Sequence, residues 1–376
     1  MSEDILQIVL DQTDRMLGEN VTKEVLSASD RGTWPGDLWR SVEEAGLQHA
    51  MVPEARDGIG LSWSDTSALI RRMGYWALPL PLPETIIANW LWCSAGGDKL
   101  DGPAAFGPVV HHDRIVIEEG PDGCLLQGTM HHVPWLSNVH QLIVLAADGA
   151  GGRRLCLLPA QKIVASGSRL NLAREPRENV CLDGITISSK HTRSISLASV
   201  EPGLQPYAAA IRAQQIVGGL ERSLEFALKY ANERVQFGRP IAKFQAIQHM
   251  LAVAACHVAA ATAAADALSL AERLDDASLA IAIAKARCGE AAGTVAAICH
   301  QVHGAMGFTQ EHPLHFTTRR LWSWRDEGGS ETHWQEWIGR AVCAAGSNLL
   351  WPTIVDGSAG RSSADMRPFA QNAITG

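Results

Sequence analysis

The chain has 376 residues, of which 46% are hydrophobic and 19% charged, so it is long enough for two or three domains with a sizeable core. It carries 32 Lys and Arg against 40 Asp and Glu, a net charge of −8, and it has no basic run typical of a nucleic-acid or membrane surface. Composition therefore excludes a nucleic-acid or membrane partner and favours a small molecule or another protein.

The first residues, MSEDILQIVL, lack a basic region followed by an apolar one, and charges interrupt the apolar runs before they reach about 18 residues. This pattern predicts a soluble, cytoplasmic protein. The eight cysteines are scattered and form no Cys-x-x-Cys pair, so we expect reduced, mostly buried thiols and neither disulfides nor a zinc site.

The N-terminal region, residues 1–100, repeats apolar residues at helical spacing, as at Ile5, Ile8 and Val9. Gly and Pro mark the loops between these segments. We predict an N-terminal helical domain.

The middle region, residues 101–200, has a different texture. Short runs rich in Val, Ile and Leu, separated by Gly, Asp and Asn, occur at 114–118, 141–146, 154–158 and 184–188. No helix-length period separates them, which predicts a small β-barrel or sandwich domain.

The third region, residues 201–350, returns to the helical period, with long Ala-rich segments at 205–232, 241–273 and 276–305. Such segments pack closely and antiparallel, so we predict a four-helix bundle. Residues 351–376 mix Gly, Ser, Asp and Pro and are expected to form a flexible tail. The predicted fold class is α+β.

Between the first two long segments lies ERVQFGRPIAKFQAIQHMLA, residues 233–252. Pro240 fixes φ, Gly238 permits a tight reversal and Phe237 is an apolar plug, so a rigid corner is predicted. Arg234 ends the preceding helix, where its guanidinium is free to bind a phosphate. Taken singly, Arg234 is equally compatible with an ordinary charge at a helix C-terminus.

This corner closely resembles the Arg-x-x-Phe-Gly-x-Pro-Ile and Phe-Gln-x-x-Gln motif of the acyl-CoA dehydrogenase family, and the domain order is similar from about residue 5 to 347. The resemblance implies that Arg234 and Gln236 grip the pyrophosphate of FAD bound to an adjacent subunit. It places Phe237 and Gln245 beside the adenine half. An FAD cofactor and an oligomer, either homomeric or heteromeric, are therefore expected.

A second stretch, HQVHGAMGFTQEHP at 300–313, resembles the family's Gln-x-x-Gly-Gly-x-Gly-Phe/Tyr turn. Gln301 and Gly304 match the pattern, and Ala305 replaces the second glycine. The resemblance implies that Gln301 and the backbone at Gly304 contact the adenine and ribose of FAD.

A third stretch, WLSN at 135–138, resembles the family's Trp-Ile-Thr/Ser-Asn segment. It implies that Trp135 stacks near the isoalloxazine ring and that the Ser137 hydroxyl binds flavin N5 or O4; a core tryptophan is the alternative. The family's Thr-Glu-Pro-x-x-Gly-Ser-Asp loop has no counterpart, since AAFGPVVHHD at 104–113 stands in its place. Retention of FAD is left open by this departure.

The segment RRLWSWRDEGGSETHWQ, residues 319–335, resembles the family segment that ends in Tyr-Glu-Gly-Thr-Ser-Glu. Glu327 precedes a glycine as the family's catalytic glutamate does, which implies that Glu327 takes the α proton of an acyl thioester. Gly329 replaces a threonine and keeps only its amide for the flavin pyrophosphate.

Three observations bear on this assignment. Asp326 is an alternative base, because the spacing is one residue shorter than usual. Some family branches place the base on the preceding long helix, but that position falls near Ala208, which cannot act. A solvated carboxylate within the Arg325–Glu327 charge run is the non-catalytic alternative for Glu327.

The histidine pairs His111–His112 and His131–His132 lack acidic or cysteine companions at ligand spacing. We predict surface or polar-core histidines and no metal site.

Together, the residues predict an FAD-dependent acyl-CoA dehydrogenase of fatty acid or steroid degradation. It would convert an acyl-CoA to its trans-2-enoyl-CoA and pass the electrons to an electron-transfer flavoprotein. A non-catalytic or half-catalytic subunit of a heteromeric acyl-CoA dehydrogenase is the first alternative. An oxidase that uses oxygen is the second, and the acyl group itself is left open.

Overall fold

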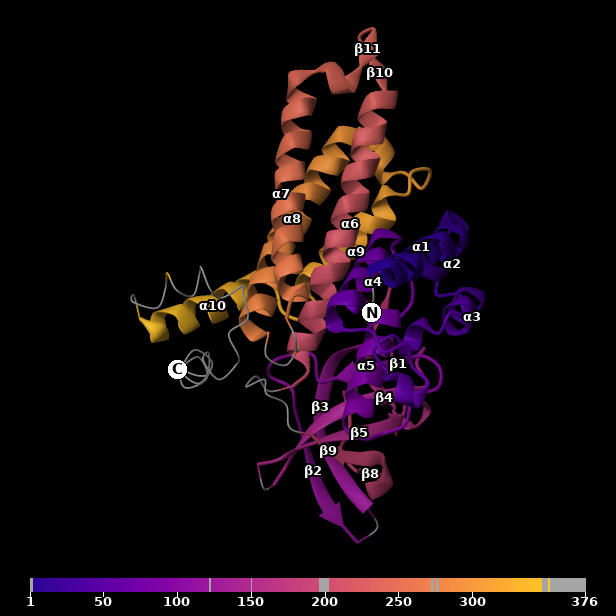
Figure 1. Cartoon of the computed structure of the whole chain (residues 1–376), viewed down its shortest axis with the longest axis vertical. Helices are drawn as coiled ribbons and strands as arrows, with labels where there is room; N and C mark the ends of the chain where they lie inside the picture. Colours follow the sequence, from indigo (N-terminus) through magenta and orange to yellow (C-terminus); the bar gives the residue numbers. More distant parts are fainter. Residues whose placement is uncertain are drawn as a thin grey trace.

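The chain begins with helices, continues as a β-sheet and ends with a second group of helices (Figure 1), as an α+β protein does. This computed structural model describes residues 3–121, 123–149, 151–195, 203–271, 274, 277–346 and 351. The predicted tail therefore lies outside the described residues, apart from residue 351. The domain boundaries near residues 100 and 200 stay predictions.

The N-terminal helices pack beside the lower half of the long helices (Figure 1). Two of them begin at a hydroxyl cap, because the side chain of Thr22 accepts a hydrogen bond from Val25 N and that of Ser62 accepts one from Asp65 N. Their bounds are α1 (Glu3–Asn20), α2 (Lys23–Asp30), α3 (Gly36–Glu44), α4 (Trp63–Tyr75) and α5 (Leu82–Ser94).

The middle region forms one nine-stranded sheet with the order β6-β7-β3-β2-β4-β5-β9; β1 also pairs with β4, and β8 with β3. Most pairs are antiparallel, but β1 and β2 both run parallel to β4. The four predicted runs match β2, β4, β5 and β8, and the other five strands lacked a clear sequence signal. The bounds are β1 (Ala104–Gly107), β2 (Arg114–Gly120), β3 (Gly123–Pro134), β4 (Gln141–Asp148), β5 (Arg153–Pro159), β6 (Ala165–Leu170), β7 (Pro176–Cys181), β8 (Ile185–Ile187) and β9 (Thr192–Ser194).

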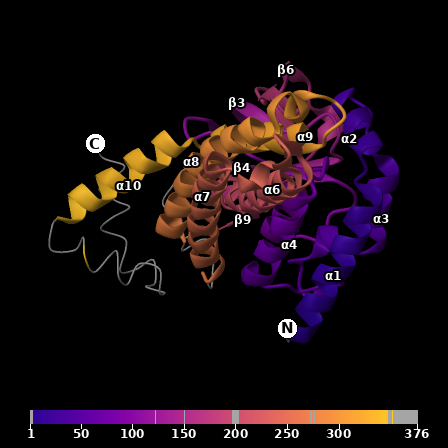
Figure 2. The ribbon, with the colours of Figure 1, turned by 90° about the horizontal axis from the view of Figure 1, so that it is seen from above.

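The C-terminal helices form an upright bundle of α6, α7, α8 and α9, from which α10 projects to one side (Figures 1 and 2). The three long predicted segments match α6, α7 and α8 to within a few residues. A short hairpin, β10 (Val235–Gln236) and β11 (Arg239–Pro240), joins α6 to α7 at the upper end. The helix bounds are α6 (Gln205–Glu233), α7 (Gln245–Ser269), α8 (Ser278–His303), α9 (Leu314–Asp326) and α10 (Glu331–Ala345).

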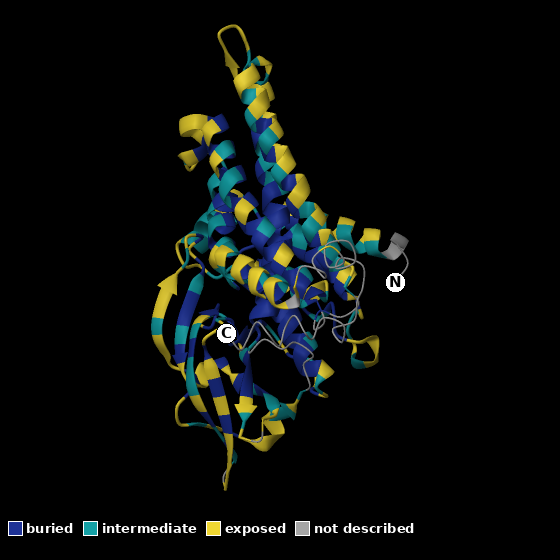
Figure 3. Ribbon diagram, turned by 90° about the vertical axis from the view of Figure 1, so that its left-hand side faces the viewer, coloured by how far each residue is buried: buried dark blue, intermediate teal, exposed yellow. Residues whose placement is uncertain are grey.

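One helix, α7, is long and apolar enough to cross a membrane, with a mean hydropathy of 1.6 over its best window. Only 33% of that window is buried, yet α7 packs against α6 and α8 within the bundle. Its exposed apolar side is visible in Figure 3 as a ribbon of mixed colours. Such a side indicates a surface that another chain could cover.

Two glycines let α4 and α6 approach each other closely. A Cβ at Gly74 would lie 2.1 Å from the carbonyl oxygen of Gln215, and one at Gly218 would lie 1.9 Å from that of Arg71. Any larger side chain would therefore push the helices apart. This contact fixes the N-terminal helices against the start of α6, where the largest polar network of the molecule lies.

Candidate functional site

A cavity of about 570 Å³ lies where the sheet, the first half of α6 and the end of α9 meet. Its apolar wall includes Phe106, Val109 and Ile211, and its polar wall includes Arg177 and Glu327. A largely apolar pocket with a few convergent polar groups is the usual form of a small-molecule site.

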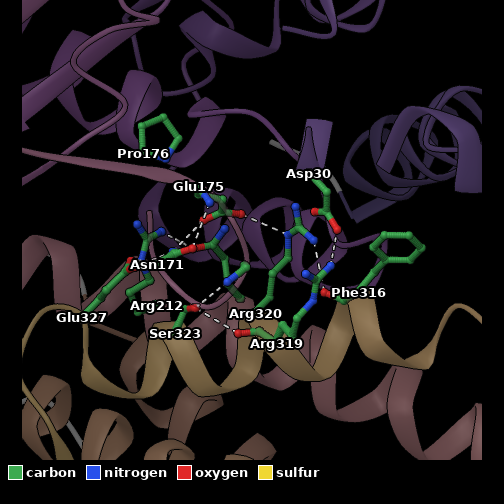
Figure 4. A network of polar contacts seen from close by, with 12 residues as sticks. Asp30, Asn171, Glu175, Pro176, Arg212, Phe316, Arg319, Arg320, Ser323 and Glu327 are labelled. Atoms are coloured by element: carbon green, nitrogen blue, oxygen red, sulfur yellow. Dashed lines mark hydrogen bonds and ion pairs between the residues drawn. The ribbon is translucent and has the colours of Figure 1, made fainter. Parts of the chain in front are cut away.

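Glu327 ends α9 and points its carboxylate at two arginines (Figure 4). Arg177 on β7 binds both carboxylate oxygens, with Nε to Oε1 and Nη2 to Oε2 at 2.9 Å each. Arg212 on α6 donates from Nε to Oε2 at 2.8 Å, and Asn171 donates to Oε1 at 2.9 Å. The bidentate fork is the strongest geometry available to a guanidinium and a carboxylate.

This pair belongs to a longer row of alternating charges: Glu84, Arg212, Glu327, Arg177, Glu175 and Arg320. Three acids face three arginines, so the row is neutral. All except Glu327 are nearly fully buried, and the Glu327 side chain is 19% exposed. Buried charges require such partners, because an unpaired ion loses its hydration without compensation.

The row connects all three parts of the chain, since Glu84 lies on α5, Arg177 on β7 and Arg320 on α9. It therefore fixes the helices and the sheet around the cavity as one unit. Each member is held by at least one ion pair.

The electrostatics of Glu327 follow from this geometry. Burial alone would raise the pKa of the carboxyl group, but Arg177 and then Arg212 outweigh it and hold the pKa at about 2. In this arrangement Glu327 is a fully ionised and weakly basic carboxylate. To act as a base it would need the arginine field to weaken.

Two glycines follow Glu327 and supply free backbone donors. Gly328 (φ 67°) and Gly329 (φ 97°) both adopt left-handed conformations, and their N–H groups have no hydrogen-bond partner in the part of the chain that the structure describes. A Cβ at Gly328 would lie 2.7 Å from Ala209 N, and one at Gly329 would lie 2.7 Å from the Trp334 ring. Successive free N–H groups of this kind suit an anion or a carbonyl oxygen.

The carbonyl groups of the same loop are anchored. Lys285 on α8 donates to the carbonyl oxygens of Arg325 and Gly329 at 2.6 Å each, and Trp334 donates to that of Gly328 at 2.9 Å. Burial lowers the pKa of Lys285 to about 8. Lys285 thus holds the loop so that its N–H groups stay on the cavity side.

The resemblance places one thioester contact on the backbone N–H of the glutamate. In the structure the Glu327 N–H bonds to the Ser323 carbonyl oxygen at 3.2 Å within α9, so that donor is already engaged. Asp326, the alternative base, also lines the cavity, is exposed, and forms no ion pair with any described residue. The local charge run does not exist as such, because Arg325 pairs with Glu331 instead.

Four of the predicted flavin contacts lie together at the hairpin end of the bundle, away from the cavity. Arg234, Gln236, Phe237 and Gln245 are all exposed, and Arg234 has no ion pair with any residue that the structure describes. Figure 1 shows this hairpin at the top and the sheet at the bottom. These residues and the cavity of the same chain cannot hold one cofactor.

The turn of this hairpin is unusual. Phe237 has φ 52° and Gly238 has φ 79°, the pair of positive φ values of a type I′ turn. A Phe in this conformation costs about 1–2 kcal/mol, and its side chain is 92% exposed. A strained and exposed aromatic ring at a tip indicates a binding role. With the free guanidinium of Arg234, it suits a dinucleotide, so the residues present fit FAD.

Gln301 and Gly304 lie at the end of α8, and both are exposed. Gly304 has φ 58° and ψ −141°, so it ends the helix in a conformation open to glycine. A Cβ there would meet no atom within 4 Å, which leaves its backbone accessible. Their predicted contacts with FAD remain untested.

Trp135 and Ser137 are placed differently from the flavin contacts expected of them. Trp135 is 5% exposed within the core of the sheet and packs edge-on against Trp34 at 6.3 Å. The Ser137 hydroxyl is exposed and donates to Asn138. Neither lines the cavity, so the core-tryptophan alternative has the better geometric support and the flavin role stays a prediction.

The expectation that the histidine pairs lack an acidic companion is wrong. Asp113 lies between His112 and His131, with the possible ligand atoms of all three within 4.8 Å of one another. Both Asp113 oxygens accept hydrogen bonds from His131, one from the ring and one from the backbone N–H. Asp113 is therefore satisfied by hydrogen bonds. The sequence hid this pairing because His131 comes from the neighbouring strand.

The comparisons with known proteins agree with this fold and site. Residues 204–342 match the family model described as acyl-CoA dehydrogenase, C-terminal domain. The chain is also 29% identical over 305 residues to the acyl-CoA dehydrogenase IpdE2 of Mycobacterium tuberculosis, covering 78% of this chain and 82% of that protein. The chain belongs to the acyl-CoA dehydrogenase family, a family of oxidoreductases.

Solved acyl-CoA dehydrogenase structures share the fold. A chain of the ChsE4–ChsE5 complex from Mycobacterium tuberculosis superposes with a TM-score of 0.79 at 21% identity, covering 91% of this chain and 98% of that one. Butyryl-CoA dehydrogenase from Megasphaera elsdenii superposes with a TM-score of 0.77 at 18% identity, covering 89% and 97%. The Tcur3481–Tcur3483 steroid ACAD gives 0.77 at 22% identity, covering 95% and 99%.

Several residues of the site were missed from the sequence: Glu84, Asn171, Arg177, Arg212 and Lys285. Two of them left a signal, because Arg212 and Lys285 are lone charges within Ala-rich helices. A charge at a position of low exposure implies a partner. The partner itself, however, has no sequence signature.

Proposed function

We propose that this chain catalyses the FAD-dependent α,β-dehydrogenation of an acyl-CoA thioester to its trans-2-enoyl-CoA. The supporting observation is the juxtaposition, on the wall of one apolar cavity, of the Glu327 carboxylate and two free backbone N–H groups. These are the groups that proton abstraction next to a thioester carbonyl requires.

In the proposed reaction a Glu327 oxygen takes the α proton of the acyl group. FAD, when bound, accepts the β hydrogen as a hydride. The Gly328 N–H polarises the thioester carbonyl oxygen, since the Glu327 N–H is engaged within α9. Arg177 and Arg212 orient the carboxylate, and their hold must loosen as it gains a proton.

The proposed flavin site needs two copies of the chain, or this chain and a related one. Arg234 and Gln236 of one copy hold the cofactor pyrophosphate, with Phe237 and Gln245 beside the adenine half. The remaining proposed contacts with FAD are Trp135, Ser137, Gln301, Gly304 and the Gly329 N–H. An electron-transfer flavoprotein is the proposed electron acceptor, and a soluble, cytoplasmic location is part of the proposal.

A second candidate function has a specific observation in its favour. A glutamate held by two arginines at a pKa of about 2 also suits a subunit that does not itself abstract protons. One structural neighbour is the ChsE4–ChsE5 complex, an assembly of two different proteins. The chain would then be a non-catalytic or half-catalytic subunit of a heteromeric acyl-CoA dehydrogenase.

The test is to purify the chain alone and record its flavin absorbance, then add a panel of acyl-CoAs without oxygen. Bleaching of the flavin by a thioester, lost in Glu327→Gln and kept in Asp326→Asn, would support the first proposal. Flavin-free protein that binds FAD only with a related second chain would support the subunit role. Release of hydrogen peroxide on turnover would replace the electron-transfer flavoprotein by oxygen.

A further inference from the structure

A third arginine, Arg169 on β6, lines the same cavity. In the antiparallel pairing of β6 with β7 it lies directly opposite Arg177. Directly opposed residues on antiparallel strands project from the same face of the sheet. The two guanidinium groups therefore share one wall of the cavity.

Arg169 differs from Arg177 in having no counterion. Arg177 is paired with Glu175 and Glu327, whereas Arg169 forms no hydrogen bond or ion pair with any residue in the described parts of the chain. Like charges opposed across a sheet destabilise the pairing unless an anion lies near them. Asp326, the exposed acid on the cavity wall, forms no ion pair with Arg169.

The charge balance of the buried row explains what such an anion would do. The row is neutral only while Glu327 is ionised, and a proton on Glu327 leaves three arginines against two glutamates. An anion beside Arg169 and Arg177 restores the balance. It also weakens the field that keeps Glu327 a poor base, because the anion offsets part of the Arg177 charge.

We propose that the acyl group of the substrate carries a carboxylate, which binds Arg169 while the thioester lies against Glu327. This inference rests on the proposed dehydrogenation and names its substrate class. Leu170, Leu172 and Val110 supply apolar surface for the hydrocarbon between the two ends. A phosphate of CoA is a poorer occupant, since the long pantetheine arm keeps the phosphates away from a thioester bound at Glu327.

The experiment measures the affinity of the holoenzyme for matched thioesters by titration calorimetry: adipyl-CoA against hexanoyl-CoA, and succinyl-CoA against butyryl-CoA. The wild-type protein should bind the carboxylated member of at least one pair about tenfold tighter, the gain of one charge-assisted hydrogen bond. Arg169→Gln should remove this preference and Arg169→Lys should keep part of it. Lys162→Gln, which removes an exposed charge shortly before β6 and outside the cavity, should leave it unchanged.

Each other outcome overturns a defined part of the reasoning. Equal affinity for both members, with flavin bleaching by the neutral thioester, refutes the carboxylate and leaves the dehydrogenation standing. An equal loss of affinity for both thioesters and for free CoA in Arg169→Gln assigns Arg169 to a CoA phosphate, which also refutes it. If no thioester binds, the proposed function fails together with this inference.

Discussion

The neutral row of buried charges makes Glu327→Gln the most informative substitution. Glutamine keeps the size of the side chain but leaves Arg177 and Arg212 with one negative charge fewer. The pKa of Glu327 is lowered from 4.5 to about 2, and the corresponding linkage free energy is about 3 kcal/mol at neutral pH. Removal of one partner from a buried ion pair typically costs a similar amount, about 3–5 kcal/mol.

We therefore expect Glu327→Gln to lose about 3 kcal/mol of unfolding free energy in urea at pH 7, and to melt roughly 6 °C or more below the wild type. Asp326→Asn is the matched control. It removes the neighbouring, exposed carboxylate and should change the stability by less than about 0.5 kcal/mol.

The pH dependence gives an independent check. A carboxylate whose pKa is lowered on folding stabilises the protein above its unfolded pKa, and this contribution is lost as the pH falls toward the folded value. The difference between wild type and Glu327→Gln should be constant from pH 7 to about 5, then shrink by about 1.4 kcal/mol per pH unit below about 4.5. A variant as stable as the wild type at pH 7, or a difference independent of pH, would refute the ion-pair network as described.

Three further predictions concern the loop and the hairpin. Lys285→Met should lower the unfolding free energy by about 3 kcal/mol, because two buried carbonyl groups lose their donor; a melting temperature within about 1 °C of the wild type would contradict this role. Phe237→Asn should relieve about 1 kcal/mol of turn strain yet reduce the flavin retained on purification; unchanged flavin content would leave the exposed ring without its proposed role. Arg234→Ala should lower FAD affinity about tenfold or more by equilibrium dialysis, whereas Lys229→Ala, an exposed cation on the same helix, should not.

Much of the helical part could be predicted because its signals are local. The Ala-rich periodic segments gave α6, α7 and α8 nearly to the residue, and the Phe237–Gly238 turn followed from its own sequence. The sheet was less accessible. Strands β3, β6 and β7 carry polar residues on exposed faces, and their pairing depends on segments far along the chain.

The candidate site shows the same division. The sequence pointed to Glu327 and the two glycines after it, since an acid before two glycines at the end of a helix is a local pattern. The partners of Glu327 lie 150 and 115 residues away at Arg177 and Arg212, and no spacing rule connects them.

What the sequence determined by itself was therefore the set of helices, the turn geometry and the family resemblance, all of which depend on residues close together in the chain. The tertiary structure decided which charges meet. A buried carboxylate must find compensation wherever the fold brings a cation, and this requirement places Arg177 and Arg212 on Glu327 while Arg169, one strand away, is left without a counterion among the described residues.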